Sequence, residues 1–347
     1  MGKAETESQY KREIVEYIQT SSVLERFGHC ISSSFTGILE PEMCLLRNLI
    51  YYTRSALAVL VLCTGGLYGV IASVFCTLIG KQYLAQWTTG RFFYYAMAIV
   101  FGIDVKVENE HYLDNKPFII IANHQSALDI FMLGRVFPKG CTITAKKSLK
   151  YTPFLGWFMA LSGTLFLERS NRTKSIEVLN RSLEKMKKKK RALWIFAEGT
   201  RSYSTELTML PFKKGAFHLA QQGGVPIVPV VVSNTSTLLN PKWKIFNRGC
   251  INVKILEPIP TNELKKEDVG KFSEDVRDLM VGELKKMGYS PYFKDTDVPP
   301  EVKLLERRAS EHTDDQDNTC SSESDLSEAI SSENTSERIH ESVKEFK

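Results

Sequence analysis

His124 and Asp129 carry the side chains of a base and of a carboxylate that could orient it, five residues apart in the stretch NHQSALD. An imidazole can take a proton from a hydroxyl group, while a carboxylate holds its tautomer and stabilises the imidazolium. On one ideal helix the two side chains would point about 140° apart. The pair therefore requires His124 in the turn after a strand and Asp129 in the first turn of a helix, with Ser126 as N-cap. Taken alone, Asp129 could instead be a partner of the helix dipole.

A second group of polar residues follows the very apolar segment 192–197 and consists of Glu198, Gly199, Thr200 and Arg201. The C-terminal ends of parallel strands are where α/β proteins build their sites. Arg201 offers a planar, permanently charged fork that suits a phosphate monoester, and Gly199 permits close backbone approach. The alternative is an internal salt bridge between Glu198 and Arg201 that closes a loop.

Two more apolar segments end in cations. Arg169 closes the stretch GTLFLER, which begins at Gly163, and Lys146 and Lys147 follow segment 141–145. A solvated surface position is the alternative for Arg169 taken alone. Because parallel strands end at one edge of a sheet, we expect these cations to converge on the edge that holds His124.

The segments that must position these residues alternate in character beyond residue 105. Short apolar runs predict strands at 117–122, 141–145, 164–167, 192–197, 225–232 and 251–255. Amphipathic segments predict helices at 127–136, 153–161, 173–189 and 214–222, and a long helix or helix pair at 262–287. This alternation indicates an α/β domain with a mostly parallel sheet covered by helices on both faces. Two prolines in 225–232 predict an edge strand, or one whose prolines face an opening.

A long apolar segment precedes this domain. Residues 55–80 include no charged side chain over 26 positions, which as a helix would span about 39 Å, more than a hydrocarbon core of about 30 Å. The alternative is a buried core helix. The aromatic-rich segment 92–103 predicts an interfacial or re-entrant element. Residues 45–104 are therefore expected to anchor the chain in a membrane.

Charge is distributed unevenly along the chain. Residues 301–347 hold thirteen acidic and six basic side chains, a net of −7, so the total of +5 leaves +12 on residues 1–300. A basic body suits phosphate esters, CoA, acidic lipid surfaces or nucleic acid. We expect a polar N-terminal extension at 1–44, a catalytic domain at 105–300 and an acidic, Ser-rich disordered tail at 301–347.

Several chemistries find no support in the sequence. The seven cysteines form no CxxC pair and have no His at zinc-ligand spacing, so no metal site is expected. The chain has no GxSxG elbow, no P-loop and no GxGxxG after a strand, which argues against an α/β-hydrolase, an NTPase and a dinucleotide enzyme. The basic run 187–191 could indicate a membrane-tethered nucleic-acid binder, but no aromatics are interleaved with it. No nucleic-acid partner is therefore expected.

In order, the stretches NHQSALD, GTLFLER, FAEGTR and VPIVPV resemble the four motifs of the glycerolipid acyltransferases, most closely the fungal 1-acyl-sn-glycerol-3-phosphate acyltransferases. The likeness covers about residues 45 to 300. It implies the fold of that family, with His124 and Asp129 as the catalytic pair of its HxxxxD motif. It also implies that Arg169, Glu198, Gly199, Thr200 and Arg201 bind the phosphate of the acceptor, with Lys146 and Gly163 beside them. Ala197 stands where the family usually has proline, so the loop lacks the fixed φ that proline would give it.

The resemblance further implies a reaction and a location. The reaction is acyl transfer from acyl-CoA, as a substrate and not a cofactor, to the sn-2 hydroxyl of lysophosphatidic acid, giving phosphatidic acid. The location is the endoplasmic reticulum or lipid droplets, with the catalytic domain facing the cytosol. The alternatives are another acceptor, such as glycerol-3-phosphate or a different lysophospholipid, and a non-catalytic protein that binds acyl-CoA or lipid.

Overall fold

The computed structural model describes residues 29–168, 172–293 and 298–305 of the chain. The chain divides into two units, 1–53 and 54–347, and helix α2 (His29–Leu78) runs through the boundary between them. Most of the predicted extension at 1–44 and of the predicted tail at 301–347 lies outside the described residues, as does Arg169.

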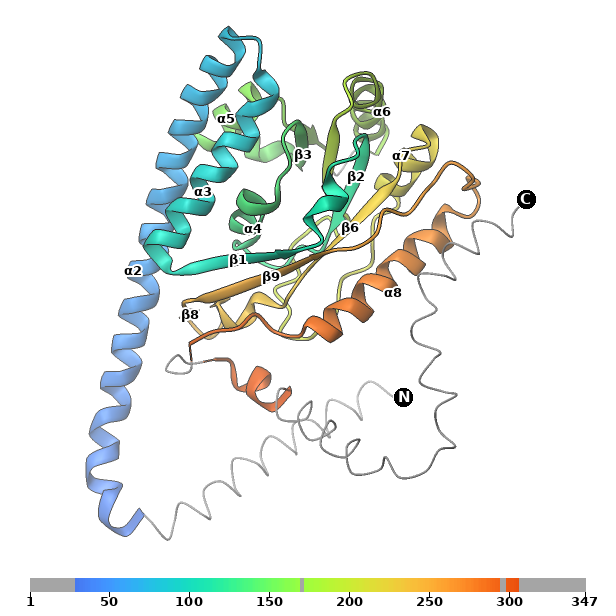
Figure 1. The fold of residues 1–347 in the computed structure, drawn as a ribbon. Coiled ribbons are helices and arrows are strands. Elements are labelled where there is room, and N and C mark those ends of the chain that lie inside the picture. The colour runs from blue at the N-terminus through green and yellow to red at the C-terminus, as the bar shows by residue number, and fades with distance from the viewer. Residues whose placement is uncertain (1–28, 169–171, 294–297, 306–347) are drawn as a thin grey trace, which may run out of the picture. The chain divides into compact units, whose positions relative to one another are not determined.

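A seven-stranded sheet forms the centre of the second unit (Figure 1). Its strands are β1 (Ile103–Glu108), β2 (Phe118–Ala122), β3 (Cys141–Lys146), β4 (Leu165–Leu167), β5 (Ala192–Phe196), β6 (Ile227–Val232) and β9 (Gly249–Ile255). They lie in the order β1-β9-β6-β2-β5-β3-β4, and every neighbouring pair is parallel except β6 and β9. The prediction of a mostly parallel sheet is confirmed.

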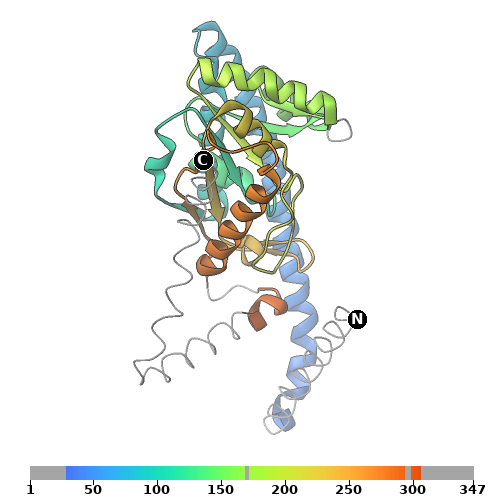
Figure 2. The ribbon, with the colours of Figure 1, turned by 90° about the vertical axis from the view of Figure 1, so that its right-hand side faces the viewer.

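Helices cover both faces of the sheet (Figures 1 and 2). The helices that cover the sheet beyond α2 include α3 (Ala85–Phe101), α4 (Asp129–Val136), α5 (Leu155–Leu161), α6 (Arg172–Lys188), α7 (Gly215–Gly223) and α8 (Val269–Met287), and residues 300–305 are also helical. Alternate side chains of a strand point to opposite faces. Ile119 and Ile121 of β2 accordingly pack into a core with α6, α7 and α8, while α3 and α4 lie on the other side.

Shorter elements complete the second unit. The 3₁₀ turns are η1 (Gln82–Leu84), η2 (Glu110–Leu113), η3 (Lys147–Tyr151) and η4 (Thr235–Thr237). Strands β7 (Leu239–Asn240) and β8 (Ile245–Phe246) form a separate antiparallel pair. The sequence predicted neither this pair nor β1, whose first residue lies at the end of the apolar segment 92–103.

The prediction that 225–232 is an edge strand was wrong, because β6 lies between β2 and β9 and is buried along its whole length. Pro226 precedes the strand, which starts at Ile227. Pro229 falls where the partner ladder is interrupted, since Ile227 pairs with Ile259 and the ladder to β9 begins only at Val230. The missing N–H of proline therefore faces a gap in the pairing and not the edge of the sheet.

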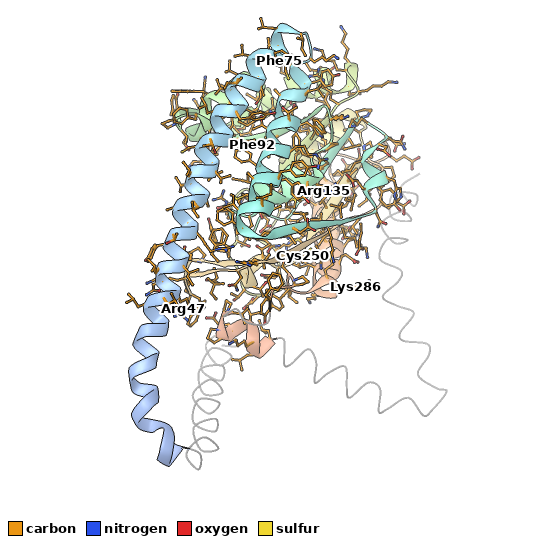
Figure 3. The ribbon with its side chains drawn as sticks, turned by 60° about the vertical axis from the view of Figure 1, so that its left-hand side comes forward. Arg47, Phe75, Phe92, Arg135, Cys250 and Lys286 are labelled. Atoms are coloured by element: carbon orange, nitrogen blue, oxygen red, sulfur yellow. The ribbon has the colours of Figure 1, made fainter. Side chains whose placement is uncertain are left out.

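Two long apolar helices precede the sheet in sequence. In the described residues, one helical segment, Leu45–Leu78, is long and apolar enough to cross a membrane by length and composition. Helix α3 is continuous over Ala85–Phe101 and is not a re-entrant turn; it buries Phe93 and Met97, and exposes Ile99 to 82%. Phe92 of α3, labelled in Figure 3, stacks on Tyr68 of α2, with 4.9 Å between the ring centroids. This contact joins the two helices.

Helix α3 and helix α4 touch through their backbones. A Cβ atom at Gly134 of α4 would collide with the carbonyl oxygen of Gly90 on α3. Glycine at both positions permits this close crossing. Since α4 begins at Asp129, the same crossing fixes where that carboxylate lies.

Candidate active site

His124 and Asp129 are in direct contact. His124 lies just beyond β2, Asp129 is the first residue of α4, and Nδ1 of His124 is 2.5 Å from Oδ2 of Asp129. The His124 side chain is 16% exposed and that of Asp129 only 2%. The turn-and-helix arrangement that the spacing required is therefore present.

The loop between the two residues is held by the same carboxylate. Oδ2 of Asp129 also accepts hydrogen bonds from the backbone N–H groups of Gln125, at 2.9 Å, and Ser126, at 3.2 Å. The hydroxyl of Ser126 accepts from the N–H of Leu128 at 3.1 Å, so it satisfies a donor just before the helix, which starts two residues later than predicted. One oxygen thus fixes both the loop and the imidazole.

The imidazole presents its other nitrogen to the surroundings. Because Nδ1 contacts Asp129, Nε2 points away from the carboxylate, and no described residue forms a hydrogen bond with it. The ring stacks on Phe196 at the end of β5, with 4.1 Å between centroids and 17° between planes. Aspartate on one side and phenylalanine below hold Nε2 in a fixed position at the edge of the sheet.

Asn123 and Gln125 tie the His124 loop to the end of β6. The side-chain amide of Asn123 donates to the carbonyl of Val232 and accepts from its N–H, both at 2.9 Å. Gln125 donates to the same carbonyl at 2.8 Å and accepts from the N–H of Thr235 at 2.9 Å. Sequence reasoning missed both residues; the signal available was two amides flanking a histidine after a fully apolar strand.

Glu198 holds the backbone of His124. Its side chain is buried, Oε1 accepts from the N–H of His124 at 2.7 Å, and Oε2 accepts from the N–H of Leu210 at 2.9 Å. Burial raises the pKa of this carboxyl. Each oxygen accepts from a backbone donor, so Glu198 holds the His124 loop in place; the contact with the acceptor phosphate that the resemblance implied stays a prediction.

Replacing Glu198 by glutamine is expected to lower kcat about 10²-fold, because an NH₂ group would then face a backbone N–H and displace His124. KM values for both substrates should stay nearly unchanged, and steady-state kinetics measures this split. An increased KM for the acceptor at unchanged kcat would instead assign Glu198 to substrate binding.

Since the pKa of Glu198 is raised from 4.5 in the folded protein, the free energy of unfolding of the wild type should fall as pH rises above 4.5. The glutamine variant should lack this pH dependence.

The loop that carries Gly199, Thr200 and Arg201 runs beside His124. Gly199 has φ +74°, the left-handed region that favours glycine, and its N–H donates to the carbonyl of Phe196. Just after Arg201, the N–H of Ser202 donates to the carbonyl of His124 at 2.9 Å. The guanidinium of Arg201 is partly exposed and 3.3 Å from the hydroxyl of Tyr203. The loop therefore places Arg201 at the His124 edge.

The other predicted cations lie farther along that edge. Lys146 ends β3, which is separated from β2 by β5, and Lys147 pairs with Glu168 at 3.0 Å. Gly163, with φ +84°, precedes β4 and so lies toward the opposite edge of the sheet, since β4 runs parallel to β3. Arg169 lies outside the described residues, so its predicted convergence with Arg201 stays a prediction.

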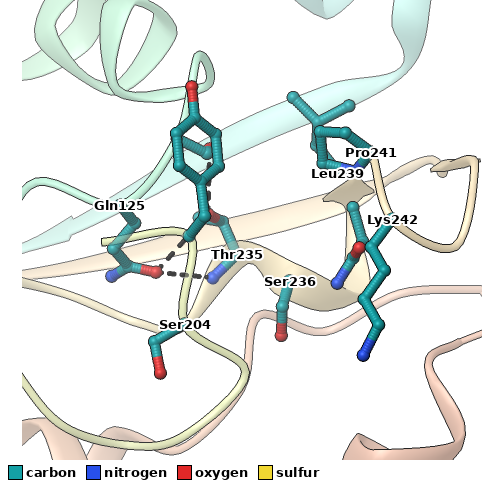
Figure 4. Close-up of a pocket in the computed structure, with 10 residues that line it drawn as sticks. Gln125, Ser204, Thr235, Ser236, Leu239, Pro241 and Lys242 are labelled. Carbon is teal, nitrogen blue, oxygen red and sulfur yellow. Dashed lines mark hydrogen bonds between the residues drawn. The ribbon is translucent and has the colours of Figure 1, made fainter. Parts of the chain in front are cut away.

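A cavity of about 380 Å³ opens next to the His124 loop (Figure 4). Its lining combines uncharged polar groups and apolar side chains with one ammonium and comprises Gln125, Ser126, Tyr203, Ser204, Thr235, Ser236, Leu239, Asn240, Pro241 and Lys242. The ammonium of Lys242 is 2.7 Å from Glu301. The cavity can therefore hydrogen-bond a neutral polar group of a substrate.

Known proteins resemble this chain in sequence and in fold. A family model described as Acyltransferase matches residues 104–233. The chain is 64% identical, over 78% of its length and 88% of the relative, to the 1-acyl-sn-glycerol-3-phosphate acyltransferase of Saccharomyces cerevisiae. It is 35% identical, over 52% of its length and 64% of the relative, to the human alpha enzyme of that name. The crystal structure of the acyltransferase PlsC from Thermotoga maritima has a TM-score of 0.52 and 27% identity, covering 70% of this chain and 95% of PlsC.

Proposed function

The chain belongs to the 1-acyl-sn-glycerol-3-phosphate acyltransferase family, and on this premise we propose that it transfers an acyl group from acyl-CoA to the sn-2 hydroxyl of lysophosphatidic acid. The product is phosphatidic acid. The observation that carries the proposal is the contact between His124 and Asp129 at the edge where the strands end, with Nε2 directed away from the carboxylate.

The proposed reaction needs no acyl-enzyme. Nε2 of His124 takes the proton of the acceptor hydroxyl as its oxygen attacks the thioester carbonyl, and Asp129 stabilises the imidazolium. The tetrahedral intermediate collapses, the C–S bond breaks, and the thiolate of CoA leaves with a proton from His124. A thiol with a pKa of about 8.5 is a good leaving group, so a strong general acid is not required.

Arg201 is the proposed ligand of the acceptor phosphate, with Gly199, Thr200, Lys146 and, through the family resemblance, Arg169 beside it. The support is its place in the loop whose Ser202 N–H donates to the carbonyl of His124. A phosphate bound there lies next to the base. This arrangement suits an acceptor whose phosphate and free hydroxyl are close together on one glycerol.

Replacing Arg201 by methionine is expected to raise KM for lysophosphatidic acid by about ten- to a hundredfold, the loss of one charge-assisted contact. KM for acyl-CoA should not change, because the phosphate concerned is on the acceptor. Arg181, exposed on α6, gives a matched control when replaced in the same way. Equal increases in both KM values would contradict the assignment.

Release of free CoA by the purified protein tests the function itself. Turnover should be fastest with lysophosphatidic acid and an acyl-CoA, and slow with glycerol-3-phosphate or with other lysophospholipids. Faster turnover with one of those would replace the acceptor while keeping the chemistry. If the protein binds acyl-CoA but releases no CoA with any of these acceptors, it is a non-catalytic binder.

We further propose that the protein acts at a membrane, with residues 45–104 as the anchoring region, 105–300 as the catalytic domain, and 1–44 and 301–347 as polar ends. The support is the apolar helical segment Leu45–Leu78. Endoplasmic reticulum or lipid droplets, with the catalytic domain toward the cytosol, is the proposed location. Fluorescent tagging combined with protease protection tests both.

A further inference from the structure

Between β3 and β4 the chain forms a surface that exposes large apolar side chains. This surface, residues 147–161, consists of η3 and α5 with the residues that join them. The exposed fractions are 39% for Leu149, 75% for Tyr151, 54% for Trp157 and 43% for Leu161. Exposure of four large apolar side chains to water on one short segment is unfavourable, and large apolar patches commonly mark interaction sites.

Lysines accompany these apolar groups. Lys147 and Lys150 lie in the same surface and Lys146 directly precedes it; all three are exposed. Glu168 pairs with Lys147 at 3.0 Å. Within residues 146–161 the sequence has three lysines and no acidic residue. Tryptophan, tyrosine and lysine together are the composition of segments that lie at the interface of a bilayer.

The 147–161 surface adjoins the apolar helix α2. A Cβ atom at Gly66 would lie 3.0 Å from the backbone nitrogen of Leu155, and one at Gly69 would lie 2.6 Å from the ring of Phe158. The two glycines thus let α5 pack closely on α2, and Figures 1 and 2 both place α5 beside this helix. On the same stretch of α2, Ile71 and Phe75 are more than 60% exposed.

We propose that the 147–161 surface is a bilayer-binding site for anionic phospholipid, formed by the catalytic domain itself beside the apolar helix α2. Tyr151 and Trp157 enter the headgroup region, and Lys147 and Lys150 contact lipid phosphates. Phe158 and Met159 face the protein interior, so α5 has one face for the core and one for lipid. The charge of the surface and its continuity with α2 favour a membrane over a protein partner.

The site has a consequence for the catalytic edge. The surface begins where β3 ends, and β3 is one of the strands whose C-terminal ends are expected to carry cations. Lipid bound at the start of the 147–161 surface therefore lies next to Lys146, at the strand end that the proposed phosphate site uses. The inference does not depend on which acceptor is used, because lipid contact can be read without turnover.

Fluorescence quenching by brominated lipids tests the proposal with the full chain in vesicles of phosphatidylcholine and phosphatidylglycerol. The Trp157 signal is the difference between wild type and W157F, and we expect it to be quenched by lipids brominated near the headgroup. Trp243, which is half-buried near Lys242, is the matched reference. Its signal is the difference between wild type and W243F, and this signal should not be quenched. An unquenched Trp157 signal would overturn the proposal.

Two lysine pairs separate anionic-lipid binding from general adhesion. In K147Q/K150Q, the phosphatidylglycerol fraction needed for half-maximal quenching of Trp157 should shift upward. In K285Q/K286Q, which changes two exposed lysines at the end of α8, it should not shift. Equal shifts in both pairs would refute the site. The site would also be refuted if the shielding of Trp157 from solvent depended on protein concentration and not on lipid. That result would identify a second copy of the chain as the occupant of the surface.

Discussion

Replacing His124 by alanine is expected to lower the rate of acyl transfer about 10³-fold, within the range of 10² to 10⁴ that a positioned general base contributes. The loss should be in kcat, because in the proposed reaction the imidazole removes a proton and Arg201, not His124, binds the acceptor phosphate. Its side chain is 16% exposed, so its removal creates only a partly enclosed gap beside Phe196. The measurement is release of CoA at saturating concentrations of both substrates.

The control for the His124 variant is a thermal unfolding curve in the same detergent, since a folded protein without activity is required. Affinity for acyl-CoA, measured without acceptor, should be unchanged. A folded variant that keeps wild-type turnover would mean that His124 is not the base, and the proposed reaction would then be wrong.

Replacing Asp129 by asparagine is expected to lower kcat by a similar factor, about 10³-fold. Oδ2 of Asp129 accepts from the imidazole and from two backbone N–H groups. An asparagine oxygen can still accept from the loop, but a neutral amide cannot stabilise an imidazolium or impose the same tautomer. The structure of the loop should therefore survive while the chemistry is lost.

Combining the two substitutions distinguishes a shared role from two separate roles. If Asp129 acts through His124, the double variant should be no slower than H124A alone, because residues that act as a unit are non-additive. Rates that multiply, with a loss near 10⁶-fold, would show that the carboxylate contributes independently of the imidazole.

The sequence predicted the sheet and the helices well because strong local signals bound each element. The fully apolar run that forms β2 starts after a proline and ends at Asn123, and β5 lies between a basic run and Glu198. The contact between His124 and Asp129 was predictable because only one arrangement of turn and helix lets residues at that spacing meet. Strand β1 was missed because its first residue continues the apolar composition of α3.

What the sequence could not supply is the direction in which buried polar groups point. Glu198 has the composition of a ligand, yet its two oxygens face the N–H groups of His124 and Leu210, one of them 74 positions away. Asn123 and Gln125 likewise act through β6, more than 100 positions later. The error over Pro229 has the same origin, since a gap in a neighbouring ladder is a property of two distant segments.

At the crossing of Gly90 and Gly134, the backbones of α3 and α4 are in close contact. We therefore expect a tilt or vertical displacement of α3 to move α4, whose first residue is Asp129. If α3 is seated in lipid, as proposed, Nε2 of His124 would stay at a constant depth relative to the headgroups. Bilayer thickness would then become a kinetic variable, since it sets how far a lysophospholipid must rise to meet that nitrogen.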